Sequence, residues 1–585
     1  MGRTLEDVIR RAQQWLAHDP DADTRSELEA LIAAGGSELA ERFSGPLAFG
    51  TAGLRGIIGA GETRMNRAVV RRTSHGLGRY LLEHEPDAAA KGVVVGYDGR
   101  RLSLEFAQDT AQVLMALGLK VHLSTGLCPT PIVAYAVNAF EAAAGVMVTA
   151  SHNPPKYNGY KVYASNGAQI IPPTDGHIAE AIAAAPEADA IELAALAGAQ
   201  PFDCSEAYLS AIAALIANRP SADRSLDIVY TPLHGVGAPL FERTMGQAGF
   251  DNVHVVAEQR EPDGAFPTVE FPNPEEPGAL DLALALADKT DATLLLANDP
   301  DADRLAAAVL SGGEYVQLTG NELGVLLGHD ALRHHALRHR ALGHQGLARA
   351  GSSDALVLAS LVSSPWLGKI AAALGARYEE TLTGFKWIAN RAMQIARDDG
   401  PPFVFGYEEA LGYTIGTVVR DKDGISAALV LACLAAELRA KGETLLDELE
   451  RIARQHGFYA SHQHSLRFPG SSGKQRMSEL MNQLRSDAPN TIAGHDVIAV
   501  SDLQEGVRRA SDGTSPIALP KSNVLVFDLD GGHRIIARPS GTEPKLKIYF
   551  DVREPFGDGD SLTHAKARAN DHIAALKAAM LTIVG

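Results

Sequence analysis

Three aspartates alternate with other residues directly after an apolar run, in the stretch "LLLANDPDADR". Asp299, Asp301 and Asp303 therefore present carboxylates that can converge on one hard cation such as Mg²⁺. An EF-hand loop is excluded, because it needs Gly at its sixth position and Glu at its twelfth, where this chain has Arg304 and Leu310. A solvated acidic turn is the alternative, but the cation of Arg304 suits a phosphate shared between protein and metal.

A serine at the end of another apolar run is the second candidate, in the stretch "VMVTASHNPPKYNGYK". The context of Ser151 is not G-x-S-x-G, which disfavours an acyl-transfer nucleophile. Two prolines stiffen the following loop, and we expect a tight turn at Asn158 and Gly159 that brings Lys161 back towards the serine. A serine that carries a phosphoryl group beside a divalent metal is chemically coherent, whereas a structural serine-rich turn is the alternative.

A third loop, "RPSGTEPK", has the composition of a phosphate cradle. Arg538 offers a guanidinium fork, Ser540 and Thr542 offer hydroxyls, and Gly541 lets backbone N–H groups approach an anion. A polar turn between two strands is the alternative. The chain lacks the Walker pattern G-x-x-x-x-G-K-[ST], and no G-x-G-x-x-G follows a strand, so the cradle is not a nucleotide motif.

The stretches "GYEEALGY" and "TLTGFKW" suit a sugar phosphate. Glu408 and Glu409 can accept hydrogen bonds from neighbouring sugar hydroxyls, and Lys386 can reach a phosphate or a reacting hydroxyl. An ordinary surface pair of carboxylates is the alternative. The other loops favour the functional interpretation of these residues.

These loops need elements that position them, and the sequence indicates an α/β fold. Each loop follows a short apolar run that is typical of a buried strand, and helix-like stretches separate the runs. Ligands in such sheets bind beyond the carboxyl ends of the strands. We therefore expect four loops on four domains to enclose one cleft. Before them, residues 1 to about 45 have the apolar spacing of a two-helix lead-in, followed by "FGTAGLRG" with Arg55.

Length and composition place the chain among ordinary globular proteins. Its 585 residues are 46% hydrophobic and 21% charged, enough for about four domains. The net charge of −18 argues against a sequence-independent grip on nucleic acid or an anionic membrane. Three separated cysteines predict neither a disulfide framework nor a zinc ribbon, and no signal peptide or membrane span is indicated. We expect a soluble protein of the reducing cytoplasm.

Composition shifts and helix boundaries divide the chain into four expected domains. The expected domains are residues 1–202, 203–311, 312–452 and 453–585.

One segment, from His329 to His344, holds five histidines. The spacing of these histidines fits no single metal geometry and no carboxylate cluster is evident, so we expect a solvated helix with a tail rather than a metal site.

Five motifs, in their order and separations, closely resemble those of the α-D-phosphohexomutase superfamily: "TASHNPPKYNGYK", "NDPDADR", "TLTGFKW", "GYEEALGY" and "RPSGTEPK". The lead-in helices and "FGTAGLRG" are most similar to the long-chain branch that contains phosphoglucomutases and phosphopentomutases. The resemblance implies four domains around a central cleft. Three would be related α/β domains with mixed sheets, carrying phosphoserine, metal and sugar in turn, and a smaller C-terminal α+β domain would bind phosphate.

The resemblance also implies a role for each candidate residue. Ser151 would carry the phosphoryl group, with His152 beside it, and would bind Mg²⁺ together with Asp299, Asp301 and Asp303. The groups serving the reaction would be Arg55, Lys161, Arg304 and Lys386, with Lys161 a candidate general base. The sugar would be held by Glu408 and Glu409, and the distal phosphate by Arg538, Ser540, Gly541 and Thr542.

The implied reaction is the interconversion of glucose 1-phosphate and glucose 6-phosphate, with glucose 1,6-bisphosphate as intermediate and activator. Small sugar phosphates would be the binding partners of a monomer or homodimer. One departure leaves the sugar open: Ala410 stands where the family's Glu-x-Ser-Gly pattern has a hydroxyl, and Leu411 precedes Gly412. Phosphopentomutase, phosphomannomutase, a glucose 1,6-bisphosphate synthase and a non-catalytic sugar-phosphate sensor are the alternatives.

Overall fold

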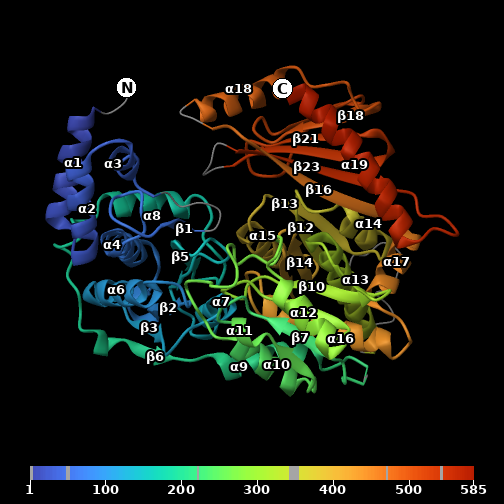
Figure 1. Cartoon of the computed structure of the whole chain (residues 1–585), viewed down its shortest axis with the longest axis horizontal. Coiled ribbons are helices and arrows are strands. Elements are labelled where there is room, and N and C mark those ends of the chain that lie inside the picture. The colour runs from blue at the N-terminus through green and yellow to red at the C-terminus, as the bar shows by residue number, and fades with distance from the viewer. Residues whose placement is uncertain are drawn as a thin grey trace. The chain divides into compact units, whose positions relative to one another are not determined.

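The chain divides into two compact units. The first unit comprises Met1–Leu318 with Gly412–Ala436, and the second comprises Thr319–Leu411 with Glu437–Gly585. A computed structural model describes residues 4–47, 53–220, 223–341, 355–469, 472–540 and 545–584 (Figure 1).

The first unit begins with three helices rather than the two that the sequence predicts. They are α1 (Leu5–His18), α2 (Ala22–Ala34) and α3 (Ser37–Arg42). The third forms because Gly35 and Gly36 take positive φ angles of 61° and 92°, which glycine adopts readily, and so end α2 and redirect the chain. Val8, Leu28, Leu39 and Phe43 then bury their side chains in one small core.

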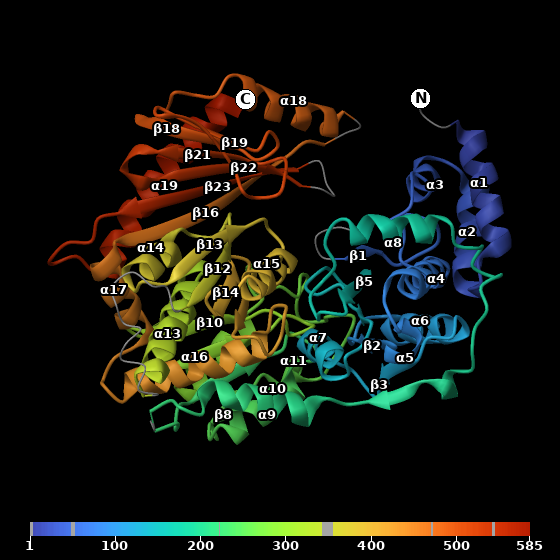
Figure 2. The same cartoon turned by 180° about the vertical axis from the view of Figure 1, so that it is seen from behind.

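The phosphoserine motif lies in a six-stranded mixed sheet whose strand order is β1-β5-β4-β2-β3-β6. Its strands are β1 (Leu54–Ile57), β2 (Val93–Tyr97), β3 (Val121–Ser124), β4 (Ala144–Val148), β5 (Tyr157–Ala164) and β6 (Gln200–Phe202). The pairs that join β4, β2, β3 and β6 are parallel, whereas β5 and β1 are antiparallel additions. The helices of this region are α4 (Arg67–His84), α5 (Ala88–Lys91), α6 (Ser103–Ala116), α7 (Thr130–Ala139) and α8 (Thr174–Ala183). Because β2 and β4 are buried throughout, helices cover this sheet (Figure 2).

A second mixed sheet of five strands, in the order β11-β10-β9-β7-β8, carries the aspartate motif. Its strands are β7 (Ile228–Thr231), β8 (Val253–Val255), β9 (Leu294–Ala297), β10 (Ala306–Ser311) and β11 (Glu314–Gln317). The accompanying helices are α9 (Ser205–Ile216), α10 (Ala238–Gln247), α11 (Ala257–Arg260) and α12 (Asp281–Thr290). Strand β15 (Gly412–Ile415) and most of helix α16 (Gly424–Arg439) complete the first unit.

The second unit begins with a third α/β region. Its strands β12 (Leu356–Ser360), β13 (Arg377–Thr381) and β14 (Phe403–Glu408) are parallel. The helices of this region are α13 (Gly320–Ala341), α14 (Trp366–Ala373), α15 (Phe385–Arg397) and α17 (Leu445–His456).

An antiparallel sheet follows, in the order β16-β23-β22-β21-β18-β19-β20. Its strands are β16 (Phe458–Arg467), β18 (His495–Asp502), β19 (Val507–Ala510), β20 (Gly513–Pro516), β21 (Leu525–Leu529), β22 (Arg534–Pro539) and β23 (Lys545–Glu554), with β17 (Thr491–Ile492) beside β18. Helix α19 (Leu562–Val584) packs on β23 and β16, and α18 (Gly473–Ser486) is the other helix here (Figure 1). The predicted fold class, three α/β domains and a C-terminal α+β domain, is confirmed.

The prediction of a tight turn at Asn158 and Gly159 is wrong. Both residues lie in β5 and pair with β1, and Lys161 follows on the same strand. Gly159 is needed for close packing of backbone, because a Cβ there would lie 2.6 Å from the carbonyl oxygens of both Leu54 and Thr149.

The histidine-rich segment also differs from the prediction of a solvated helix. Its first part lies in α13, and His329, Asp330 and His334 are buried there. Residues 342–354, including His344, lie outside the described residues. None of the helices in the described ranges has the length and apolar character needed to cross a bilayer.

One buried carboxylate ties α4 to α6 and generates a stability prediction. Asp109 is fully buried and accepts hydrogen bonds from Arg67 Nε at 2.7 Å and from Arg71 Nη2 at 3.1 Å. We expect Asp109→Asn to lower the free energy of unfolding by about 2–4 kcal/mol, because two arginines lose their counter-charge. Urea titration measures this loss. Glu180→Gln, on the exposed face of α8, is the control; an equal change in both variants would contradict the prediction.

Candidate active site

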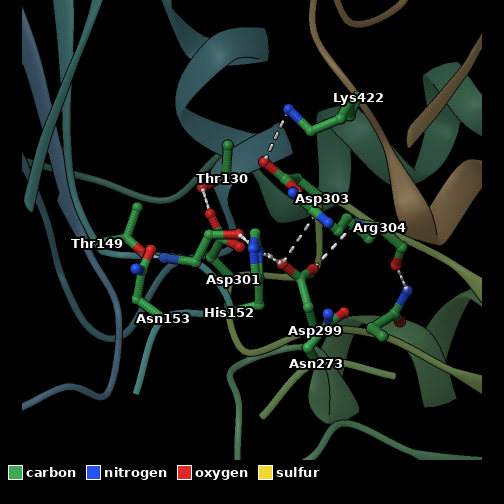
Figure 3. A network of polar contacts seen from close by, with 12 residues as sticks. Thr130, Thr149, His152, Asn153, Asn273, Asp299, Asp301, Asp303, Arg304 and Lys422 are labelled. Carbon is green, nitrogen blue, oxygen red and sulfur yellow. Dashed lines mark hydrogen bonds and ion pairs between the residues drawn. The ribbon is translucent and has the colours of Figure 1, made fainter. Parts of the chain in front are cut away.

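The serine and aspartate motifs both begin where a buried parallel strand ends. Ser151 follows β4, and the loop of Asp299, Asp301 and Asp303 follows β9. These are the carboxyl ends at which α/β sheets bind ligands. All four side chains are at most 1% exposed and belong to the first unit, where the three aspartates lie together (Figure 3).

The Ser151 loop is held in a strained conformation. Ser151 has a φ of 52°, in the left-handed region that non-glycine residues rarely adopt. Its N–H donates to Thr149 Oγ1 at 2.8 Å, and its carbonyl accepts from Arg100 Nη2 at 2.5 Å. Arg100 also donates to the carbonyls of Asn153 and Pro154, at 2.5 and 3.0 Å. The loop is therefore fixed by one buried guanidinium on its backbone.

Behind this guanidinium lies a buried carboxylate. Asp98 accepts hydrogen bonds from Thr149 Oγ1 at 2.6 Å, Ser103 Oγ at 2.7 Å and the backbone N–H of Arg100 at 3.0 Å. Asp98 therefore links the end of β2, the start of α6 and the Ser151 loop, which keeps the serine in place.

The three aspartates converge, and one of them contacts the serine. One carboxylate oxygen from each lies within 4.8 Å of those of the other two. Ser151 Oγ donates to Asp299 Oδ2 at 2.6 Å, and it also lies 3.2 Å from His152 Nδ1. A group attached to Ser151 Oγ would therefore lie next to the carboxylate cluster.

Cations from separate parts of the chain surround the cluster. Lys161 Nζ donates to Asp301 Oδ2 at 2.7 Å and to Asp303 Oδ2 at 2.8 Å. Lys422 Nζ lies 3.2 Å from Asp303 Oδ2, and Arg304 Nε lies 3.8 Å from Asp299 Oδ2 (Figure 3). These side chains offset part of the negative charge buried in the loop.

The surrounding cations do not compensate the charges of the three aspartates equally, as the directions of their pKa shifts indicate. Burial, together with the charges of Asp301 and Asp303, raises the pKa of Asp299 well above its usual value. Burial also acts to raise the pKa of Asp303, but Lys161 and Lys422 lower it below its usual value. Asp299 is therefore the carboxylate that a further cation would stabilise most.

The residues present fit a hard divalent cation. Asp301 Oδ1 and Asp303 Oδ1 are buried, and neither accepts a hydrogen bond from any described residue. Buried carboxylate oxygens require a donor or a cation, and Mg²⁺ takes oxygen ligands. Asp299, Asp301, Asp303 and a serine-bound phosphate oxygen would be the ligands.

Three further candidates lie around the loop. His152 is beside Ser151, and burial, with Arg304 and Arg55 nearby, lowers its pKa well below the usual value, so it is neutral at pH 7. Arg55 on β1 donates to Asn153 Oδ1 at 2.7 Å. Burial acts to lower the pKa of Lys161, but the two carboxylates on it raise that pKa, so Lys161 is a cation. A general base must be a neutral amine before it accepts a proton, so the general-base role of Lys161 stays a prediction.

The remaining candidates lie in the second unit. Glu408 Oε1 accepts from the backbone N–H of Gly384 at 2.6 Å, at the start of the helix that carries Lys386. Glu409 Oε2 accepts hydrogen bonds from Ser360 Oγ at 3.1 Å and from Ser363 Oγ at 3.3 Å. The end of β14 thus presents two carboxylates with fixed orientations.

The phosphate-cradle motif is described only in part. Arg538 lies on β22, opposite Lys547 of β23. Ser540 N donates to the carbonyl of Lys545 at 2.7 Å. Gly541 and Thr542 lie outside the described residues.

Sequence reasoning missed several residues of the site. Lys422 belongs to the charged run "RDKD" directly before the apolar helix α16, and that run was a usable signal. Thr130 Oγ1 donates to Asp301 Oδ2 at 2.6 Å, and its backbone N–H donates to the Asp301 carbonyl at 2.9 Å. Nothing in the local sequence marks Thr130, because its role arises from the position of α7.

The fold and the site define an α/β protein with a serine presented to a buried loop of three aspartates, and the comparisons agree with this class. Three models match the chain: "Phosphoglucomutase/phosphomannomutase, alpha/beta/alpha" domain I over residues 46–189, domain II over 206–312 and domain III over 319–453.

Curated relatives cover most of the chain. A probable phosphomannomutase of Haemophilus influenzae is 41% identical over 84% of this chain and 93% of its own length. The human phosphopentomutase is 36% identical over 96% of this chain and 94% of its own length. A phosphoglucomutase of Staphylococcus epidermidis is 36% identical over 88% of this chain and 92% of its own length. The chain belongs to the phosphoglucomutase/phosphomannomutase family, within the α-D-phosphohexomutase superfamily, and is an enzyme of the phosphomutase type.

A close backbone approach at the aspartate loop generates a prediction. A Cβ on Gly235, in the loop after β7, would lie 2.3 Å from Pro300 Cα, between Asp299 and Asp301. We expect Gly235→Ala to displace the loop and weaken Mn²⁺ binding, with Mn²⁺ as a probe for Mg²⁺, by about 10- to 100-fold. Isothermal titration calorimetry measures the affinity. Gly246→Ala on α10, where a Cβ meets nothing within 4 Å, is the control; unchanged Mn²⁺ affinity in Gly235→Ala would contradict the prediction.

Proposed function

We propose that the chain is a Mg²⁺-dependent phosphoglucomutase that interconverts glucose 1-phosphate and glucose 6-phosphate. The observation that carries this proposal is the contact of 2.6 Å between Ser151 Oγ and Asp299 Oδ2, inside a cluster of three buried aspartates ringed by cations. The family and the names of the relatives support mutase chemistry. Glucose 1,6-bisphosphate would be both the intermediate and the activator.

The reaction consists of two phosphoryl transfers with opposite directions. In the first, a hydroxyl of the sugar monophosphate attacks the phosphorus on Ser151; a new P–O bond to the sugar forms, the bond to Ser151 Oγ breaks, and the proton of the sugar hydroxyl ends on Ser151 Oγ. The bisphosphate then reverses its orientation. In the second transfer Ser151 Oγ attacks the other phosphate; a P–O bond to Ser151 forms, the P–O bond to the sugar breaks, and the serine proton ends on the sugar oxygen of the isomeric monophosphate that is released.

The chain's own groups serve both transfers. Lys161 and Arg304 flank the aspartates and would neutralise the oxygens of the transferring phosphoryl group. Mg²⁺, when bound, supplies additional positive charge to the same oxygens. The neutral imidazole of His152, at 3.2 Å from Ser151 Oγ, can exchange a hydrogen bond with the serine oxygen as its charge changes.

Groups of the second unit would hold the rest of the substrate. We assign the sugar hydroxyls to Glu408 and Glu409, a phosphate or reacting hydroxyl to Lys386, and the non-transferring phosphate to Arg538, Ser540, Gly541 and Thr542. The carboxylate of Glu409 is oriented by two serine hydroxyls, which supply polar groups next to a loop that has Ala410 in place of serine. The domain limits 1–202, 203–311, 312–452 and 453–585 remain part of this proposal.

A pentose phosphate is the second candidate substrate. Ala410 and the inserted Leu411, with a φ of 62°, alter the sugar loop relative to the family's usual pattern. The human phosphopentomutase also aligns with 96% of the chain. A loop that lacks the usual hydroxyl suits a sugar with one fewer hydroxyl-bearing carbon.

The phosphoserine proposal predicts the behaviour of one variant. Ser151→Ala has no oxygen to carry the phosphoryl group, so we expect turnover of glucose 1-phosphate to fall by about 10⁴-fold or more. A coupled assay with Mg²⁺ and a trace of glucose 1,6-bisphosphate measures the rate. Ser210→Ala on α9 is the matched control and keeps wild-type turnover. Substantial activity in a folded Ser151→Ala sample would refute the assigned carrier.

The sugar assignment is tested by a second measurement on the wild-type enzyme. We expect kcat/KM for glucose 1-phosphate to exceed that for ribose 1-phosphate by about tenfold or more, which is the discrimination that a few sugar contacts supply. Both substrates are compared with their own bisphosphates as activators. A preference for ribose 1-phosphate would replace glucose by pentose and leave the phosphoserine chemistry intact.

A further inference from the structure

A second cluster of potential metal ligands lies in the second unit, apart from the aspartate loop. Asp330 and His334 are one helical turn apart on α13, and Glu437 comes from the C-terminal part of α16. One ligand atom from each lies within 4.8 Å of the other two. In the part of the chain that the structure describes, this group and the aspartate loop are the two that converge in this way.

The distances within the cluster differ from those of direct imidazole–carboxylate hydrogen bonds. His334 Nε2 lies 3.4 Å from Asp330 Oδ1 and 3.7 Å from Glu437 Oε2. The same unit offers two comparisons: His495 Nδ1 lies 2.9 Å from Asp530, and His572 Nδ1 lies 2.6 Å from Glu554. The cluster is therefore more open than a directly bonded pair.

These wider separations match the space around a bound ion. Two ligands held at about 2.0–2.1 Å from a tetrahedral Zn²⁺ are about 3.3–3.4 Å from one another. The separation to Asp330 already has this value, and that to Glu437 needs a side-chain shift of a few tenths of an ångström. An imidazole with two carboxylates is a donor set that Zn²⁺ accepts, with a water molecule in the fourth position.

The three side chains are buried, and they lie on helices rather than on loops. The side chains of Asp330, His334 and Glu437 are only 1%, 9% and 9% exposed. Residues four apart share one face of a helix, so α13 presents its two ligands together without a loop. The neighbouring side chains of His329 and Arg333 lie 3.1 and 3.6 Å from a different carboxylate, that of Glu448.

We propose that Asp330, His334 and Glu437 bind a divalent transition-metal ion of the Zn²⁺ class, which links α13 to α16. A buried donor set of two carboxylates and one imidazole suits a divalent cation. The ion has a structural role, because no residue assigned to phosphoryl transfer lies among its ligands. Its binding stabilises the folded chain.

Zinc binding in excess Mg²⁺ tests this site separately from the aspartate loop. The metal-free full-length chain is dialysed against Zn²⁺ while Mg²⁺ occupies the loop, and bound zinc is measured by elemental analysis. We expect about one Zn²⁺ per wild-type chain, retained in Asp301→Asn and in the control His335→Gln, and lost in the double variant Asp330→Asn/His334→Gln. Zinc should also raise the thermal midpoint of the wild type but not of the double variant. Zinc that survives in the double variant, or that disappears only with Asp301→Asn, overturns the proposal.

A measurement on the wild type keeps the test decisive if the double variant does not fold. Paramagnetic Co²⁺, a substitute for Zn²⁺, shifts the proton resonances of a coordinated imidazole far outside their ordinary range. We expect one such set of imidazole resonances from the Co²⁺-loaded chain in excess Mg²⁺, because the aspartate loop offers only oxygen ligands. A Co²⁺-loaded chain without shifted imidazole resonances overturns the proposal.

Discussion

Three carboxylates buried on one short loop repel one another, and much of the polar structure of the first unit offsets this repulsion. Two unit charges about 4 Å apart interact by about 4 kcal/mol at the effective dielectric constant near a protein surface. Two of the compensating cations come from distant parts of the chain, Lys161 from β5 and Lys422 from the segment before α16, and the third, Arg304, comes from the loop itself. The loop therefore depends on the packing of the whole unit, and Asp299 remains the member whose ionisation is least favoured.

A second buried cation, Arg100, holds the serine loop beside these aspartates. A residue at a φ of 52° costs about 1–3 kcal/mol, and the hydrogen bonds from Arg100 to the surrounding carbonyls offset that cost. The result is a hydroxyl fixed against Asp299 before any substrate arrives. Catalysis of phosphoryl transfer relies on such positioning and on charge, since the protein forms few covalent bonds during the reaction.

A comparable cation organises the second unit. Arg534 on β22 bonds Asp551 on β23 at 2.9 Å, Glu380 on β13 at 2.9 Å and the carbonyl of Ser363 at 2.7 Å. One buried guanidinium thus joins the third α/β region to the antiparallel sheet, next to the serines that orient Glu409. Glu408 on β14 and Arg538 on β22, two of the residues proposed to hold the substrate, therefore lie on connected elements.

The sequence by itself determined the α/β fold class, the strand-then-loop placement of Ser151 and the aspartates, and the family, because these depend on local periodicity and on residue types at short spacing. It misassigned Asn158 and Gly159 to a turn and the His334 segment to solvent. It gave no sign of Thr130 in the site. Only the tertiary structure decided these three features. Each depends on residues far away in the chain: on the strand that packs against Gly159, on the elements that cover the face of α13, and on the side chains that reach the carboxylate of Asp301.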